Sequence, residues 1–170
     1  RLYKRGWTGI NIDLDFNSID LFNFFRKNDF NINTAISDKN EETDLYFFHN
    51  RSAINTLSKE SGVKAKEIRK IKTHTLNDII ENSPFKDKKI NYLSIDVEGH
   101  EISVLNGFDL NKYKPELVII EFIDTKIKEF YLNQIDNIIS SDIYNFMTKH
   151  DYKLINWVHD DLIFVPNNIK

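Results

Sequence analysis

Two carboxylates and a histidine that could take part in chemistry lie together in the stretch YLSIDVEGHEISVLNGF, residues 92–108. Asp96, Glu98 and His100 follow an apolar run directly, at the point where a buried strand is expected to end. Carboxylates in this position can surround a reacting hydroxyl or a cofactor amine, Gly99 lets the backbone approach closely, and a histidine can act as a general base near neutral pH. The same residues also suit the first turn of a helix, because acidic side chains can accept hydrogen bonds from the free N–H groups there. Catalysis and helix capping are therefore both open interpretations of this stretch.

Two further acids stand at or near predicted strand ends. Residues 9–13 have the pattern of a short strand that ends in Asp13. An acid there can accept two hydrogen bonds from a ribose diol, and it can equally begin the turn into the next helix. Glu121 lies inside the apolar run VIIEFI, where an unpaired carboxylate would be costly. We expect it either to line a pocket or to form a salt bridge with a lysine on a covering helix.

Several common catalytic and metal-binding motifs are absent from the sequence. The five glycines are too widely spaced for a GxGxxG loop, and no P-loop, nucleophile elbow or zinc-protease helix occurs. The chain has no cysteine, which excludes disulfides, thiolate zinc sites and cysteine nucleophiles and fits a reducing cytoplasm. His159 with Asp160 and Asp161 resembles a hairpin turn, because no second pair of ligands has suitable spacing. The sequence predicts no metal site.

Length and composition describe one ordinary globular domain that spans residues 1–170. With 170 residues, of which 41% are hydrophobic and 29% charged, the chain can bury a core without disulfides or metals. The net charge is −3, and basic residues are scattered apart from the run between Lys64 and Lys72, so nucleic-acid binding is not expected. The apolar runs fall well short of the ~18 residues that a membrane span needs.

Patterns typical of strands and helices alternate along the chain. Helix N-caps are expected at Asn17 or Ser18, at Thr75, and at Ser140 or Ser141. Residues 59–69 read as a short helix or a connection. Strands are predicted at 9–13, 30–37, 45–49, 54–57, 71–75, 90–97, 116–123, 152–158 and 162–165, and helices at 17–27, 75–83, 99–107 and around 143–147.

This order of elements predicts an α/β fold. We expect a mostly parallel sheet with an antiparallel C-terminal strand pair and helices on both faces, and we expect the strands at 90–97 and 116–123 to be covered on both sides. In such a sheet, ligands bind beyond the carboxyl ends of the parallel strands. Asp13 and Asp96 should therefore meet at one crevice.

The chain resembles a known family. YLSIDVEGHEISVLNGF, followed by YKPELVIIEF, resembles the central signature of FkbM-family methyltransferases, and the IDVEGHE block is the most specific part. GWTGINIDLDFNSIDLF, NINTAISD and YKLINWVHDDLIFVP are similar to the flanking blocks of the family, so the resemblance covers nearly the whole chain. It implies a Rossmann-like class I methyltransferase fold that uses S-adenosyl-L-methionine as cofactor.

The resemblance also implies where the cofactor would bind. In that family the acid that ends the second strand holds the cofactor ribose, and Asp13 occupies the matching position with Leu14 beside it. The turn after the third strand flanks the adenine, which maps to Ala35, Ile36 and Ser37. These assignments agree with the ribose interpretation of Asp13 that strand position alone suggests.

The acids of the IDVEG motif face the methyl donor or acceptor in the family, which maps to Asp96 and Glu98 and, less directly, to His100. The implied reaction is O-methylation of a hydroxyl on a sugar, glycan or related small molecule. A different hypothesis is a catalytically inactive Rossmann-like remnant that binds a partner. A nicotinamide-dependent oxidoreductase ranks last, because no convincing Tyr-Lys or Cys-His set is present.

One departure from the family pattern concerns the N-terminal side. Family members carry a first strand and a glycine-containing loop ahead of the block with which this chain opens, so we expect a domain without its first strand and helix. That loop wraps the methionine part of the cofactor, and its strand is central in the sheet. The chain as given is therefore expected to bind the cofactor poorly and to expose two strand edges.

Overall fold

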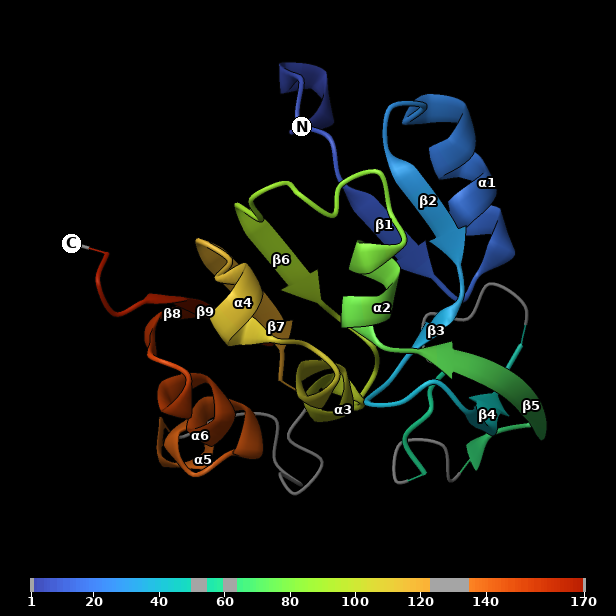
Figure 1. Cartoon of the computed structure of the whole chain (residues 1–170). Coiled ribbons are helices and arrows are strands. Elements are labelled where there is room, and N and C mark those ends of the chain that lie inside the picture. Colours follow the sequence, from blue (N-terminus) through green and yellow to red (C-terminus); the bar gives the residue numbers. More distant parts are fainter. Residues whose placement is uncertain (1, 50–54, 60–63, 123–134, 170) are drawn as a thin grey trace.

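A computed structural model describes residues 2–49, 55–59, 64–122 and 135–169 as a mixed α/β structure (Figure 1). The described strands form three sheets, with the orders β1-β2, β3-β5-β4 and β6-β7-β9-β8. The strands are β1 (Ile10–Asp13), β2 (Phe30–Asn33), β3 (Ala35–Ile36), β4 (Glu42–Phe47), β5 (Glu67–His74), β6 (Tyr92–Ile95), β7 (Leu117–Glu121), β8 (Tyr152–Val158) and β9 (Asp161–Pro166). The helices are the short η1 (Tyr3–Arg5), α1 (Phe16–Phe25), α2 (Leu76–Glu81), α3 (Glu101–Asn106), α4 (Leu110–Tyr113), α5 (Ile135–Ile139) and α6 (Asp142–Lys149).

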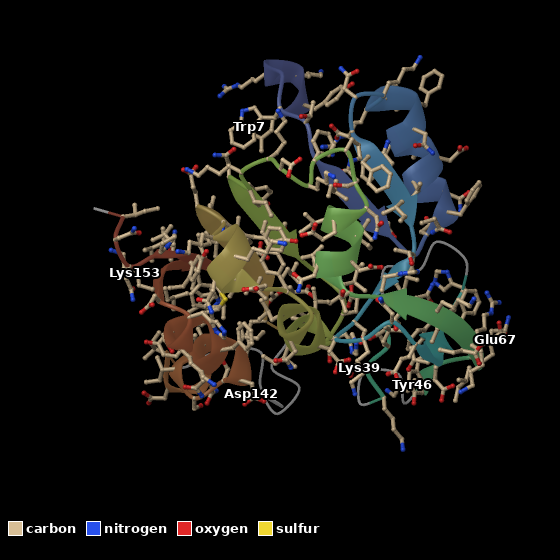
Figure 2. All side chains as sticks on the ribbon, in the orientation of Figure 1. Trp7, Lys39, Tyr46, Glu67, Asp142 and Lys153 are labelled. Atoms are coloured by element: carbon tan, nitrogen blue, oxygen red, sulfur yellow. The ribbon has the colours of Figure 1, made fainter. Side chains whose placement is uncertain are left out.

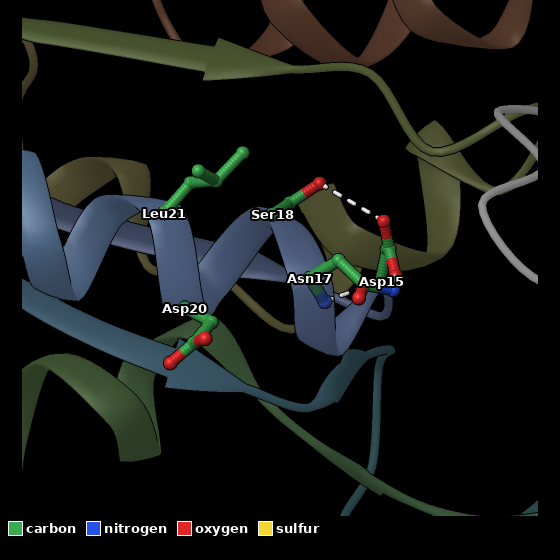
Figure 3. A pocket seen from close by; sticks show the side chains of 5 residues that line it. All are labelled: Asp15, Asn17, Ser18, Asp20 and Leu21. Atoms are coloured by element: carbon green, nitrogen blue, oxygen red, sulfur yellow. Dashed lines mark hydrogen bonds between the residues drawn. The ribbon is translucent and has the colours of Figure 1, made fainter.

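Helix α1 packs on the parallel pair β1–β2 and begins earlier than predicted. The expected caps, Asn17 and Ser18, lie inside the helix, and the actual N-cap is Asp15. Its carboxylate accepts the Asn17 N–H at 3.1 Å and the Ser18 hydroxyl at 3.3 Å (Figure 3). An ionised side chain suits the positive end of a helix better than an amide or hydroxyl does. Hydrogen bonding from Asn17 correspondingly lowers the pKa of Asp15.

The extended pattern at 30–37 folds as two strands that belong to different sheets, which corrects the prediction of one strand. β2 pairs with β1, whereas β3 pairs with β5, both in parallel. The Thr34 N–H donates to the Asp13 carbonyl at 3.3 Å, and the Ser37 N–H donates to the His74 carbonyl at 2.9 Å. The chain thus leaves one ladder and joins the next across the single residue Thr34. The alternation of side chains in the sequence can continue when a strand changes its pairing partner. The pattern therefore cannot indicate where such a change occurs.

The antiparallel pair β4–β5 forms where the sequence was hardest to interpret. β4 begins at Glu42, ahead of the predicted strand at 45–49, and β5 begins at Glu67, inside the segment 59–69 for which we predicted a helix or a connection. Most side chains of β5 are exposed and many are charged. A strand of this kind lacks the apolar alternation that sequence patterns depend on.

Cross-strand contacts stabilise this polar pair. Lys70 lies opposite Asp44 with 2.6 Å between Nζ and Oδ1, and exposed opposite charges in such a pair contribute a few tenths of a kcal/mol, about the scale of other cross-strand pairs. Of the strand predicted at 54–57, residue 54 lies outside the described residues. The remainder forms an isolated bridge between Thr56 and Tyr46. Figure 2 shows Tyr46 and Glu67 together at the end of the molecule that β4 and β5 form.

The largest described sheet is only partly parallel. β6 pairs with β7 in parallel, and β7–β9 and β9–β8 are antiparallel, as predicted for the C-terminal pair. Among all the described strands, parallel and antiparallel pairs are equally frequent. The prediction of a mostly parallel sheet is therefore not confirmed. β6 was expected to be covered on both faces, yet Tyr92 and Ser94 are exposed. These two side chains share one face of the strand, whereas Leu93 and Ile95 are more buried on the other, so β6 is covered mainly on one side.

Several element ends match the sequence prediction. Thr75 caps α2 by accepting the Asp78 N–H, and Ser141, rather than Ser140, caps α6 by accepting the Tyr144 N–H. The chain reverses between β8 and β9 at the predicted turn. Helix α3 begins at Glu101 instead of Gly99, while α4 and α5 were not predicted because their four and five residues are too short to show a helical period.

The hydrophobic core lies between the β6–β7–β9 sheet and the helices α2, α3, α5 and α6. Buried residues that form it include Leu105, Val118, Ile120, Met147 and Phe164, each with no exposed surface. α3 and α6 contact each other, and α6 contacts β8. None of the helices in the described part is long and apolar enough to cross a membrane.

Candidate functional site

A cavity of about 1700 Å³ lies between β1 and β6 and gathers most of the predicted site residues. β1 and β6 run in the same direction on its two sides (Figure 1), so Asp13 and Asp96 reach it from corresponding strand ends. Trp7 contributes to the opposite end of the cavity, near the start of β6 (Figure 2). The predicted site residues among its lining are Asp13, Leu14, Ala35, Ile36, Asp96, Glu98 and His100.

The Asp13 end of the cavity is a short turn with local hydrogen bonds. Asp13 Oδ1 accepts the Asp15 N–H at 2.7 Å, which is the turn-forming role considered from the sequence. Asn33 donates its side-chain amide to the carbonyls of Asp13 and Leu14, at 2.9 Å each. Among the described residues, these contacts engage Asp13 Oδ1 and leave Oδ2 without a hydrogen-bond donor. The turn role and a ligand-binding role are therefore compatible at Asp13.

The turn after β6 is built around a buried carboxylate. Glu101 is only 4% exposed, and its Oε1 accepts the N–H groups of Val97 at 3.1 Å and Gly99 at 3.0 Å. Burial raises the pKa of Glu101, and the N–H groups offset part of that rise. Glu98 and Gly99 have φ values of 56° and 89°, in the left-handed region. Glycine adopts this conformation without strain, whereas Glu98 needs the surrounding bonds to hold it there.

Three acids converge next to this turn. Carboxylate oxygens of Asp96, Glu98 and Glu121 lie within 4.8 Å of one another. Burial, followed by the charges of Asp96 and Glu98, raises the pKa of Glu121 to about 8. Burial and the Asp96 charge also raise the pKa of Glu98. Three like charges this close favour retention of a proton, and a group of this size can also hold a cation.

Glu121 was expected to line a pocket or to pair with a lysine. It forms no salt bridge within the described chain, and its Oε2 is buried without a hydrogen-bond partner there. The carboxyl instead joins Asp96 and Glu98 at the ends of neighbouring strands. An ionised, unpaired carboxylate would be costly in this position, which agrees with the raised pKa.

His100 is half-buried and contacts Ser37. Its Nε2 lies 3.0 Å from Ser37 Oγ, and the Ser37 hydroxyl also donates to Asp38 Oδ1 at 3.1 Å. Burial lowers the pKa of His100, while the nearby Asp38 charge raises it. Ser37 is 6% exposed and does not line the cavity, unlike Ala35 and Ile36. The structure therefore places Ser37 against the predicted base.

The sequence did not indicate the role of Thr56 in this site. Its hydroxyl donates to the Glu98 carbonyl at 2.6 Å and accepts the Ser58 N–H at 2.9 Å, and the residue is 1% exposed. It thereby helps to hold the left-handed turn at Glu98. A threonine in a polar segment carries no pattern that reveals a partner 42 positions away, so only the three-dimensional structure identifies it.

A smaller hollow of about 400 Å³ lies at the start of α1 (Figure 3). It is lined by Asp15, Asn17, Ser18, Asp20 and Leu21. Figure 3 shows Asp15 bonded to Asn17 and Ser18, so the polar groups serve to cap the helix. The large cavity, rather than this hollow, is the candidate site.

Comparison with known proteins yields one match. The family model described as methyltransferase FkbM domain matches residues 1–154. No curated protein and no solved structure shows significant similarity.

Proposed function

Because the chain belongs to the methyltransferase FkbM domain family, we propose that it uses S-adenosyl-L-methionine to methylate a hydroxyl oxygen on a sugar, glycan or related small molecule. The observation that supports this most directly is the placement of Asp13, Asp96, Glu98 and His100 around one cavity. The cysteine-free sequence also leads us to propose a reducing compartment such as the cytoplasm.

The cavity offers groups that suit this cofactor. Asp13 has a carboxylate oxygen available for ribose hydroxyls, and the cavity wall formed by β3 is apolar, with Ala35 2% and Ile36 9% exposed. Leu14 lines the same region and would add apolar contact to an adenine ring. A pocket with apolar walls and a few polar groups is typical of small-molecule sites.

The reaction needs orientation and removal of a proton. S-adenosyl-L-methionine, when bound, supplies an electrophilic methyl group. We propose that Asp96 and Glu98 hydrogen-bond the acceptor hydroxyl and hold it in line, because orientation can supply much of the rate enhancement of such a reaction. His100 then takes the hydroxyl proton.

We also propose a Rossmann-like arrangement of the sheets. β1 and β6 each have one strand partner among the described residues, β2 and β7 respectively, and their other edges border the same cavity. One further parallel strand in this position would complete both hydrogen-bond ladders and join the two sheets in the order β2-β1-strand-β6-β7-β9-β8.

Calorimetric titration with S-adenosylhomocysteine tests the cofactor assignment. The complete gene product that contains residues 1–170 should bind it, and Asp13→Ala should weaken binding at least tenfold because the ribose contact is lost. Asp20→Ala serves as the control, since Asp20 is an exposed acid on α1 outside the large cavity. Absence of binding by the wild-type protein would exclude the proposed methyltransferase. Binding without transfer to any hydroxylated acceptor would instead favour a binding module.

A further inference from the structure

The Ser37 hydroxyl lies between a carboxylate and an imidazole. It is 3.1 Å from Asp38 Oδ1 and 3.0 Å from His100 Nε2. A hydroxyl has one proton to donate, whereas an ionised carboxylate can only accept. The three groups are therefore satisfied together when Ser37 donates to Asp38 and accepts from His100.

The backbone fixes the position of this hydroxyl. The Ser37 N–H donates to the His74 carbonyl at 2.9 Å, as part of the link between β3 and β5. On the other side, the Ser37 carbonyl packs against Gly107, where an added Cβ would lie only 2.4 Å from that oxygen. Ser37 is 6% exposed, so water has little access to compete for its hydroxyl. The end of β3 and the two ends of α3 thus hold Ser37 and His100 in contact.

We infer that Ser37 and Asp38 are positioning residues that hold neutral His100 in the tautomer protonated at Nε2, which leaves Nδ1 as the proton acceptor. In a neutral imidazole, one nitrogen donates and the other accepts, so a proton fixed at Nε2 frees the lone pair of Nδ1. No described residue forms a hydrogen bond with Nδ1. His100 borders the cavity together with Asp96 and Glu98, so a ligand there can approach the ring.

This inference rests on the proposed function for its catalytic consequence. The proton of the acceptor hydroxyl moves to Nδ1, the hydroxyl oxygen forms its bond to the methyl carbon, and the carbon–sulfur bond breaks with its electron pair retained by sulfur. His100 becomes an imidazolium that donates from Nε2 through Ser37 toward Asp38. The Asp38 carboxylate stabilises that positive charge.

Nitrogen NMR of histidine measures the tautomer directly and requires neither cofactor nor activity. The protein is labelled with ¹⁵N-histidine, and the His100 signals among the five histidines are assigned with a His100→Gln variant. Above the pKa of the ring, we expect Nε2 to show a protonated shift and Nδ1 an unprotonated one. Ser37→Ala should move His100 toward a mixture of tautomers, whereas Ser140→Ala, which removes an exposed hydroxyl elsewhere, should not. Asp38→Asn keeps an acceptor oxygen and should retain the tautomer.

Kinetics with the complete gene product extend the test. Ser37→Ala is expected to lower kcat about tenfold with little change in KM for the acceptor, since it removes orientation of the base and not acceptor binding. A wild-type His100 protonated at Nδ1 overturns the inference, whether or not the cofactor binds. The expected tautomer together with no cofactor binding rejects the proposed methyltransferase and leaves the tautomer assignment in place. An unchanged tautomer in a folded Ser37→Ala protein would also overturn the inference.

Discussion

The two strand ends that face the cavity share a sequence signature but are built differently. At the end of β1, Asp13 forms a local hydrogen bond to the next turn and keeps one carboxylate oxygen available. At the end of β6, the turn is held by buried Glu101 from within and by Thr56 from a distant segment. An acid after an apolar run can therefore be either a locally held turn residue or part of a preorganised cluster.

The difference indicates which of the two turns depends more on support from the surrounding structure. The β6 turn contains a left-handed Glu98 and a set of close carboxylates, both of which are unfavourable in isolation. Buried hydrogen bonds to the turn backbone offset these costs. The Asp13 turn contains no such strain, so it needs less support. Substitutions at the two ends should therefore differ in their effect on the free energy of unfolding.

The largest effect is expected from Glu101→Ala. The substitution leaves the N–H groups of Val97 and Gly99 without their acceptor in a buried turn, at about 1–3 kcal/mol for each unsatisfied group. We expect a total loss of about 3 kcal/mol in urea denaturation. Glu101→Gln keeps an acceptor oxygen and should lose less. Glu41→Ala, at an exposed glutamate whose carboxylate forms no hydrogen bond or ion pair within the described chain, is the control and should unfold like the wild type; equal losses for Glu101→Ala and this control would contradict the role of the buried carboxylate.

Gly107→Ala should have the next largest effect. A Cβ at Gly107 would lie 2.4 Å from the Ser37 carbonyl oxygen, so α3 and the end of β3 must separate. Overpacking against backbone costs about 1–3 kcal/mol, and the His100 signals in the NMR experiment should shift as well. Gly9→Ala is the matched control, because nothing lies within 4 Å of its added Cβ. Similar melting temperatures for the two variants would show that the contact at Gly107 is not tight.

A pH-dependent difference is expected between wild type and Glu121→Gln. The pKa of Glu121 rises to about 8 in the folded chain from an ordinary value of 4.5, so the folded state holds more protons between these values. Its contribution to stability is full below about pH 4.5 and is lost as pH rises toward 8. Because Glu121 is partly solvated, we expect a total loss of about 1–2 kcal/mol, which is less than the whole rise in pKa would give at the ~1.4 kcal/mol per pKa unit of a wholly buried group. Urea denaturation at several pH values measures the difference, and parallel curves for the two proteins would disprove it.

The smallest loss of stability is expected from Asp13→Ala. One partly exposed hydrogen bond to the Asp15 N–H disappears, which costs about 0.5–1 kcal/mol. The same substitution should have its main effect on cofactor binding, as proposed above. A loss of stability as large as that of Glu101→Ala would show that the two strand ends are supported alike.

The sequence correctly predicted features that depend only on residues close together in the chain. Thr75 and Ser141 cap their helices, and β8 and β9 form the expected antiparallel pair, because caps and hairpin turns depend on neighbouring residues. The proximity of Asp96, Glu98 and His100 also follows from a short segment. These features could be predicted without knowledge of what packs against them.

Features that depend on distant partners could not be predicted. The change of sheet between β2 and β3, the polar pair β4–β5 and the contact from Thr56 to Glu98 all involve residues far apart in the sequence. The contact from Ser37 to His100 spans 63 positions, so the family assignment of Ser37 to the adenine gave no sign of it. Propensity and periodicity describe one segment at a time, whereas tertiary packing decides these cases.

The positions of the two tryptophans would allow ligand binding in the cavity to be followed by tryptophan fluorescence. Trp7 is 44% exposed and borders the cavity, whereas Trp157 belongs to β8, and its indole N–H donates to the His159 carbonyl. Replacing Trp157 with phenylalanine would leave Trp7 as the single tryptophan, which can be excited selectively over the tyrosines. The emission maximum of that protein would then report the polarity around Trp7, so occupation of the cavity could be followed in real time without any added label.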